Sequence, residues 1–340
     1  MNGGTAGANP PPMRERKKET EMSLYPREIT EYLALSGIPR GPNSKIYLVD
    51  SVHGSNSNSG DRWTKPLLTL EAAEDLCVTG HNDTVLLMNS ATEYALAAML
   101  TWDKNFTHLV GLSAETMAGK RCRVLPAADL DTMVLVSGYG NIFKNVRFSH
   151  EYNSAASLTN VKITGPRNYF ENVEFIGNVY TAQAIDGGCS LRIANNAGEC
   201  LFKHCMIGTD GTESATGHMG MVVDAAAPPA RLRFENCHFA AFPASTGAGF
   251  VELLGTTFQR AWVLDRCEFI NAHTHFVMAS AFVVPGGFDP SGGSIFLKDC
   301  YGYGFTDWEA GDTGAVRIGG GPATGAQGGF GGFFQTAEST

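Results

Sequence analysis

Two glycine-bounded segments, Gly208–Gly211 and Gly217–Gly220, carry an aspartate and a histidine, residue types that transfer protons in polysaccharide cleavage. An inverting hydrolase places two carboxyl groups about 6.5–9.5 Å apart across the sugar. Here Asp210 and His218 lie in one loop, no Asp-Asp pair lies between them, and no Arg-x-Lys sequence follows. We therefore interpret both as loop residues and predict no catalytic residue.

Metal-binding patterns are also incomplete. His273 and His275 place two imidazoles on one face of a strand, but no third ligand is identifiable in the sequence. Most of the eight cysteines are widely spaced and lack the Cys-x-x-Cys pairs of zinc sites. We predict free, structural thiols, no metal and no other cofactor.

The composition is typical of a β-rich chain with many tight turns. Glycine accounts for 40 of the 340 residues, charged residues for 17% and hydrophobic residues for 43%. The hydrophobic content excludes global disorder, and the many glycines argue against a helical bundle. The net charge of −9 excludes a nucleic-acid-binding protein that depends on bulk positive charge.

The most informative feature is a six-residue pattern that occurs six times between residues 143 and 302. Its copies begin 27, 32, 32, 30 and 33 residues apart, which indicates a repeat architecture. Short apolar runs bounded by Gly, Asn or Pro lie between them, so each unit consists of several short strands. The copies are Phe143–Phe148, Phe170–Phe175, Phe202–Ile207, Phe234–Phe239, Leu264–Phe269 and Leu297–Gly302.

The pattern requires a bend at its third residue. The last two apolar positions are spaced by two, as on one strand face, but the first lies three residues before them. Three copies have asparagine at the bend, and asparagine tolerates the left-handed conformation of a sharp turn. The preceding charged residue is expected to point outward, with mostly alternating sign. The predicted turn ladder is Asn145, Asn172, His204, Asn236, Arg266 and Asp299.

Stacking of the repeats aligns their apolar positions in columns. Cysteine occupies one column in four copies, and phenylalanine occupies another in four. At the strand spacing of about 4.8 Å, these side chains pack against one another as hydrophobic groups. The predicted core stack is Phe148, Phe175, Cys205, Cys237, Phe239, Cys267, Phe269 and Cys300.

The asparagine turn followed by an apolar and an aromatic residue resembles the right-handed parallel β-helix of the pectate-lyase-like superfamily. Residues 45–88 resemble the start of such helices in bacteriophage and cell-surface proteins, with a strand at Lys45–Asp50 and a Trp63-x-x-Pro segment. A helix capped by Thr69 and the strand Thr84–Met88 follow. The resemblance implies an all-β solenoid with a short N-terminal capping helix and flexible terminal arms. This fold carries lyases, hydrolases, adhesins and viral spikes.

We divide the chain into a flexible N-terminal arm at 1–22, an N-terminal capping module at 23–88, the β-helix at 89–309 and a glycine-rich tail at 310–340. Helical spacing also predicts a helix over Ser23–Leu35. The arm is basic in part and the tail carries phenylalanines without a core, so both are predicted to dock on partners, with a solvated, disordered arm as the alternative. The candidate partner contacts are Arg14, Arg16, Lys17, Lys18, Phe330, Phe333 and Phe334.

The resemblance and the arms lead us to expect a bacteriophage virion structural protein without enzymatic activity, such as a capsid decoration or cement protein or a tail or fibre subunit. Its expected partners are major capsid or tail proteins and further copies of itself, with a trimer favoured, but no membrane and no nucleic acid. Without a signal peptide, we expect synthesis in the host cytoplasm and location in the virion. The alternatives are a polysaccharide lyase or hydrolase, a glycan-binding tailspike and, third, an adhesin. Aromatic residues assigned to outward faces, among them Trp262 and Tyr301, would serve subunit contacts or stack on sugars.

Overall fold

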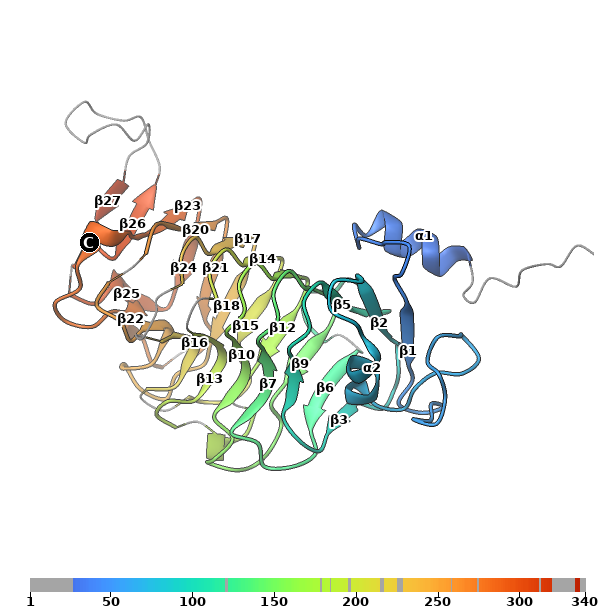
Figure 1. The fold of residues 1–340 in the computed structure, drawn as a ribbon. Helices are drawn as coiled ribbons and strands as arrows, with labels where there is room; N and C mark the ends of the chain where they lie inside the picture. Colours follow the sequence, from blue (N-terminus) through green and yellow to red (C-terminus); the bar gives the residue numbers. More distant parts are fainter. Residues whose placement is uncertain are drawn as a thin grey trace, which may run out of the picture.

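The computed structural model describes residues 27–119, 122–177, 179–183, 185–194, 197–214, 217–224, 229–257, 259–273, 275–311, 313–319 and 334–336. In these residues the chain winds into a coil, and equivalent strands of successive turns pair in parallel (Figure 1). The strands form three sheets along the coil, here named A, B and C. The predicted all-β parallel β-helix is therefore confirmed.

Each sheet takes one strand from every full turn of the coil. Sheet A contains β1 (Ile46–Val49), β2 (Asp83–Leu87), β5 (Thr107–Gly111), β8 (Ile142–Lys144), β11 (Tyr169–Glu171), β14 (Leu201–Lys203), β17 (Arg233–Glu235), β20 (Trp262–Asp265), β23 (Ile295–Lys298), β26 (Val316–Gly319) and β27 (Phe334–Thr336). Sheet B contains β3 (Tyr94–Leu96), β6 (Arg123–Pro126), β9 (Arg147–Ser149), β12 (Glu174–Ile176), β15 (Met206–Gly208), β18 (His238–Ala241), β21 (Glu268–Asn271) and β24 (Tyr301–Tyr303). Sheet C contains β4 (Leu100–Trp102), β7 (Thr132–Val136), β10 (Thr159–Ile163), β13 (Cys189–Ile193), β16 (Met219–Val223), β19 (Gly249–Leu253), β22 (Met278–Val283) and β25 (Phe305–Glu309).

The core is filled by side chains that repeat in register. Phe143, Phe170, Phe202 and Phe234 are fully buried in sheet A, and their neighbouring ring centroids lie 4.9, 4.9 and 4.5 Å apart. The rings are nearly parallel because the strands pair without a shift in register. In sheet B, the rings of Phe239 and Phe269 stack at 4.6 Å. The repeat length thus places identical side chains above one another, so that apolar surface is removed from water along the whole coil.

Two helices lie at the N-terminal end. The short helix α2 (Leu70–Leu76) is capped by Thr69, whose hydroxyl accepts a hydrogen bond from the Ala72 amide at 3.3 Å. Its Leu70 and Ala73 are buried in the main core, and the helix contacts β1, β2 and β3, so it covers this end of the coil (Figure 1). The helix α1 (Arg27–Leu35) packs Leu33 on the outer face of sheet A.

The C-terminal part of the coil extends beyond the expected boundary at residue 309. Ala315 and Val316 are buried, β26 pairs in parallel with β23, and β27 pairs antiparallel with β26. Residues 316–319 are therefore a strand of sheet A and not part of a tail. Only four residues long and flanked by glycines, this strand carries too short a pattern to be recognised as a further repeat.

Candidate functional site

The turns between sheets A and B hold the predicted turn ladder in one row. All six residues have φ between +51° and +56°, the left-handed region. At one end of the row, Asn145 Nδ2 donates to the Tyr32 hydroxyl at 3.0 Å and Asn172 Nδ2 donates to Asn145 Oδ1 at 2.8 Å. At the other end, Arg266 Nε donates to Asn236 Oδ1 at 2.9 Å. The ladder therefore forms two hydrogen-bonded stretches on the outside of the coil.

A groove of about 280 Å³ lies over the row between these two stretches. The exposed His204 lies at its centre, between Asn172 and Asn236. The loop after β5 contributes Glu115, and β21 contributes Glu268. The groove thus presents amide, imidazole and carboxylate groups to solvent.

The charged row beside the ladder is less exposed than the sequence suggested. Lys144 was expected to point into solvent, but its side chain is only 8% exposed because Glu171 lies 3.0 Å away and Glu115 lies 3.9 Å away. Burial raises the pKa of Glu171, but the hydrogen bond from Lys144 and its positive charge outweigh this effect, so the pKa lies below its usual range. Asp265 is also buried, 3.1 Å from Lys298. Alternating charges thus pair between rungs.

The far wall of the groove is anionic as well. The Tyr301 hydroxyl is the largest cause that lowers the pKa of Glu268, and burial opposes it in part. His238 Nδ1 lies 3.1 Å from Glu268 Oε2 and lowers this pKa further. Both Glu171 and Glu268 are therefore ionised at neutral pH, and the groove favours cationic ligands with several hydrogen-bond donors.

The predicted core stack lies inside the coil, and only Cys300 in it is partly exposed. The thiols of Cys205, Cys237 and Cys267 lie 3.5, 3.5 and 3.6 Å from carbonyl oxygens of the preceding rung. Burial raises the pKa of Cys237, so this thiol stays protonated and donates to the carbonyl. The column serves packing and satisfies backbone acceptors at each turn.

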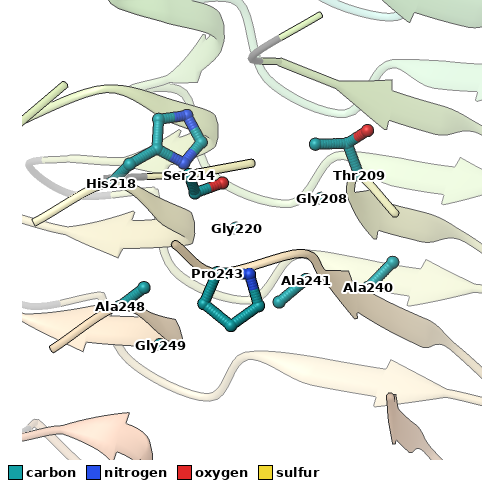
Figure 2. A pocket seen from close by; sticks show the side chains of 10 residues that line it. All are labelled: Gly208, Thr209, Ser214, His218, Gly220, Ala240, Ala241, Pro243, Ala248 and Gly249. Carbon is teal, nitrogen blue, oxygen red and sulfur yellow. The ribbon is translucent and has the colours of Figure 1, made fainter. Parts of the chain in front are cut away.

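The connections from sheet B to sheet C are longer, and they carry the residues first considered for catalysis. His218, Ser214 and Thr209 line a small cavity of about 10 Å³, roughly the size of one water molecule, and Figure 2 shows His218 beside Ser214 with Thr209 on the opposite side. Burial lowers the pKa of His218 to about 4, so its imidazole is neutral. Asp210 is exposed and does not line this cavity. The structure therefore does not bring Asp210 and His218 together in one site.

His273 is held by its own loop. Its Nδ1 accepts hydrogen bonds from the amides of His275 and Phe276 at 3.0 and 3.2 Å. Its Nε2 therefore carries the proton and donates to Glu213 Oε1 at 3.2 Å. Among the described residues, no three His, Cys, Asp or Glu side chains are grouped as ligands for a metal ion.

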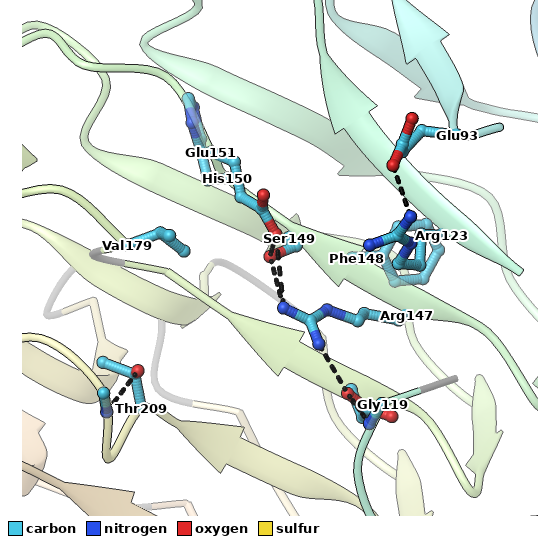
Figure 3. Close-up of polar contacts among 12 residues, drawn as sticks. Glu93, Gly119, Arg123, Arg147, Phe148, Ser149, His150, Glu151, Val179 and Thr209 are labelled. Carbon is cyan, nitrogen blue, oxygen red and sulfur yellow. Dashed lines mark hydrogen bonds and ion pairs between the residues drawn. The ribbon is translucent and has the colours of Figure 1, made fainter. Parts of the chain in front are cut away.

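The outer face of sheet B carries an ion-pair network (Figure 3). Arg147 contacts Glu151 at 3.2 Å, Ser149 at 3.3 Å and the fully buried Glu174 at 3.6 Å. The amide of Gly119 donates to Glu174 at 3.2 Å. These contacts attach the loop after β5 to the sheet, and the same loop forms one wall of the groove.

The outer face of sheet C holds charged residues that the sequence analysis missed. Arg192 Nη1 lies 3.0 Å from Asp224 Oδ1. In the sheet register, Arg192 aligns with Val222, and Val222 aligns with Glu252. Burial is the largest cause that raises the pKa of Glu252, and Asp186 raises it further. The signal was one outer row of sheet C in which Arg192 and Glu252 lie on either side of Val222. This row can be recognised only once the register is known.

The C-terminal end of the coil exposes aromatic side chains. Tyr301 is 55% exposed and Tyr303 is 70% exposed on β24, the last strand of sheet B. Trp262, by contrast, is fully buried, and its Nε1 donates to the Pro229 carbonyl at 2.6 Å. The assignment of Trp262 to an outward face was wrong, because its position in β20 points into the coil.

The candidate partner contacts mostly lie outside the described residues, namely Arg14, Arg16, Lys17, Lys18, Phe330 and Phe333. Phe334 begins β27. No helix in the described ranges is both long and apolar enough to cross a membrane.

No family profile and no curated protein matches the chain. The solved structure of the pectin methylesterase PemA from Erwinia chrysanthemi is 14% identical, covers 83% of this chain and 93% of that chain, and has a TM-score of 0.45. The pectin methylesterase from Aspergillus niger is 12% identical over 84% of this chain and 93% of that chain, with a TM-score of 0.45. ORF18 of Geobacillus virus E2 is 10% identical over 85% of this chain and 62% of that chain, with a TM-score of 0.38. At these identities the likeness concerns the β-helical fold alone.

Proposed function

We propose that the chain is a structural, non-catalytic protein of a bacteriophage virion, either a capsid decoration or cement protein or a tail or fibre subunit. The difference between the two ends of the coil supports this proposal most directly. The N-terminal end is covered by α2, whereas sheets B and C end at β24 and β25 within the described residues. A strand edge with exposed tyrosines is suited to binding another protein.

The pairing of backbone groups between rungs favours attachment through the ends of the coil. The backbone groups of inner strands are paired with the rungs on either side, so the long faces offer few free hydrogen-bonding groups. The proposed partners are major capsid or tail proteins at the C-terminal end and through the arm at residues 1–22. We further propose that copies associate as a trimer, which a native mass measurement on the purified protein tests.

The test of attachment is incorporation into particles. Particles assembled with the Tyr301→Ser/Tyr303→Ser variant should contain at least about tenfold less of the protein, because each lost aromatic contact weakens binding. Deletion of residues 1–22 should have a similar effect. The matched control is Tyr180→Ser, which removes another exposed tyrosine (43% exposed) from a loop between sheets B and C. Normal incorporation of both altered proteins would contradict the proposal.

A second candidate function is polysaccharide cleavage, favoured by the outer face of sheet C. The raised pKa of Glu252 suits a general acid, and Asp224 supplies a second carboxyl group, 3.0 Å from Arg192. If this function holds, the purified protein depolymerises a bacterial surface polysaccharide, and Glu252→Gln lowers that activity by at least about a hundredfold. If the purified protein cleaves such a polysaccharide and Glu252→Gln abolishes the cleavage, the enzymatic function would replace the structural proposal.

A further inference from the structure

The turn ladder contains an unfilled acceptor at the groove. Asn172 is only 7% exposed, and its Nδ2 is bonded to Asn145. Its Oδ1 accepts no hydrogen bond within the described part of the chain, although Asn172 lines the groove. This amide group lines the groove, and its oxygen can accept a hydrogen bond from a ligand that supplies an N–H group.

The structure itself shows which group fits such a position. Two rungs farther along, the same amide oxygen of Asn236 accepts a hydrogen bond from the guanidinium of Arg266 at 2.9 Å. His204 lies between Asn172 and Asn236 in the row, but it donates no hydrogen bond to Asn172 in the described structure. An arginine side chain that enters the groove could therefore donate to Asn172 Oδ1 in the same way as Arg266 donates to Asn236 Oδ1.

The charges around the groove agree with a cationic ligand. Lys144 is matched by Glu171 in the row beside the ladder. Glu115 and Glu268 add two further carboxylates to the walls of the groove. A guanidinium can donate to Asn172 and pair with a carboxylate at the same time, because it has five donors in a fixed plane.

We propose that this groove binds a basic, arginine-containing peptide segment, and that its occupant is the chain's own arm at Arg14–Lys18. The arm is nine residues from Arg27, the first residue of α1, a connection of at most about 30 Å. The helix is fixed to the ladder by the contact between Tyr32 and Asn145, roughly 10 Å or two rungs from His204. Tethering at this distance gives the arm a millimolar effective concentration at the groove.

The occupied groove would hold the arm against the coil until a particle competes for it. Competition by a particle rests on the proposed attachment of the protein through its arm. Binding of the arm to the groove does not depend on that attachment. Failure of arm binding can be told apart from failure of particle attachment, because the following measurement uses the purified full-length chain without any virion component.

The experiment places a photoreactive benzoylphenylalanine at Met13 in the full-length chain. Irradiation should give a cross-link within the monomer, and peptide mapping should locate it in the segments that contain Asn172, His204 or Glu268. Glu115→Gln/Glu268→Gln and Arg14→Gln/Arg16→Gln should each lower the yield at least about fivefold, and about 0.5 M salt should do the same. The matched control Glu213→Gln removes an exposed carboxylate from another loop and should leave the yield unchanged.

Cross-links that form only between two chains would show that the occupant is a neighbouring copy and would overturn binding of the chain's own arm. Cross-links scattered over the surface, or a yield that the carboxylate variants do not change, would overturn the groove as the binding site. Circular dichroism of each variant checks that the fold is retained.

Discussion

At the scale of single residues, the turn ladder shows how one backbone requirement selects residue types. A left-handed φ is needed at each turn between sheets A and B. Asparagine meets it at three positions, but His204, Arg266 and Asp299 adopt the same conformation. The surrounding strands therefore impose the turn, and the side chain at that position is free to take a second role.

The buried imidazole of His218 makes stability dependent on pH. Burial lowers its pKa to about 4, whereas an unfolded histidine titrates near about 6.5. Between these values the unfolded chain binds a proton that the folded chain does not, so the free energy of unfolding falls as the pH drops from about 6.5 to about 4. The full contribution is up to about 3 kcal/mol. Urea midpoints at pH 7 and pH 5 should differ less for His218→Gln than for the unaltered chain.

His108 contributes to the same pH dependence because burial also lowers its pKa to about 4. His108 is present in both the unaltered chain and the His218→Gln variant, so the difference in the pH dependence of their urea midpoints reports on His218. An equal loss of stability on acidification in both would contradict the assignment.

The thiols should differ sharply in reactivity. Seven cysteines are buried, and Cys300 alone is partly exposed. Under native conditions an alkylating reagent should therefore modify Cys300 first, at least about tenfold faster than any other thiol, because the reagent can reach only this sulfur. The contact with Cys267 and burial raise the pKa of Cys300, so its reaction should still be slower than that of a free thiol. Mass spectrometry of the intact chain should show one modification at early times and eight after denaturation without reductant. Fewer than eight in the denatured chain would indicate disulfides.

At the scale of elements, the sequence predicted what repeats and missed what occurs once. The six-residue pattern predicted the turns and the phenylalanine columns because each property recurs in every rung. The strand Val316–Gly319 lies after the last copy of the pattern, and Trp262 lies two residues before a copy, so the six-residue pattern marked neither position. The groove needs Glu115 from a loop to lie over residues of distant rungs, a contact that no local pattern encodes.

Stacked aromatic rings should carry much of the stability of each rung. Phe239 is fully buried and stacks on Phe269 with an interplanar angle of 5°. Phe239→Ala should lower the free energy of unfolding by about 3–5 kcal/mol, through lost burial and the cavity left behind. Denaturant unfolding measures this value, and Tyr303→Ala on the exposed last strand of sheet B serves as the control. A loss below about 1 kcal/mol for Phe239→Ala would contradict tight stacking.

At the scale of the whole molecule, each rung contacts mainly the rungs before and after it. Stability in such a coil is approximately a sum of rung and interface contributions, so protection should depend on position along the coil. Amide hydrogen exchange should be slowest in central strands such as β13 and at least about tenfold faster in β24, which has one neighbouring strand in the described structure. Uniform exchange rates along the coil would instead indicate a single cooperative unit.

The helix α2 also has a consequence for the order in which the protein forms. The closed end of the coil is encoded by residues 46–96, which leave the ribosome before the rest of the coil. Once α2 covers β1 to β3, sheets A and B already present edges on which a nascent strand can pair. Each further 30 or so residues can then wind on as translation proceeds, at about 5–20 residues per second. Synthesis and winding share one direction, so long-range pairing never has to wait for the chain to be complete.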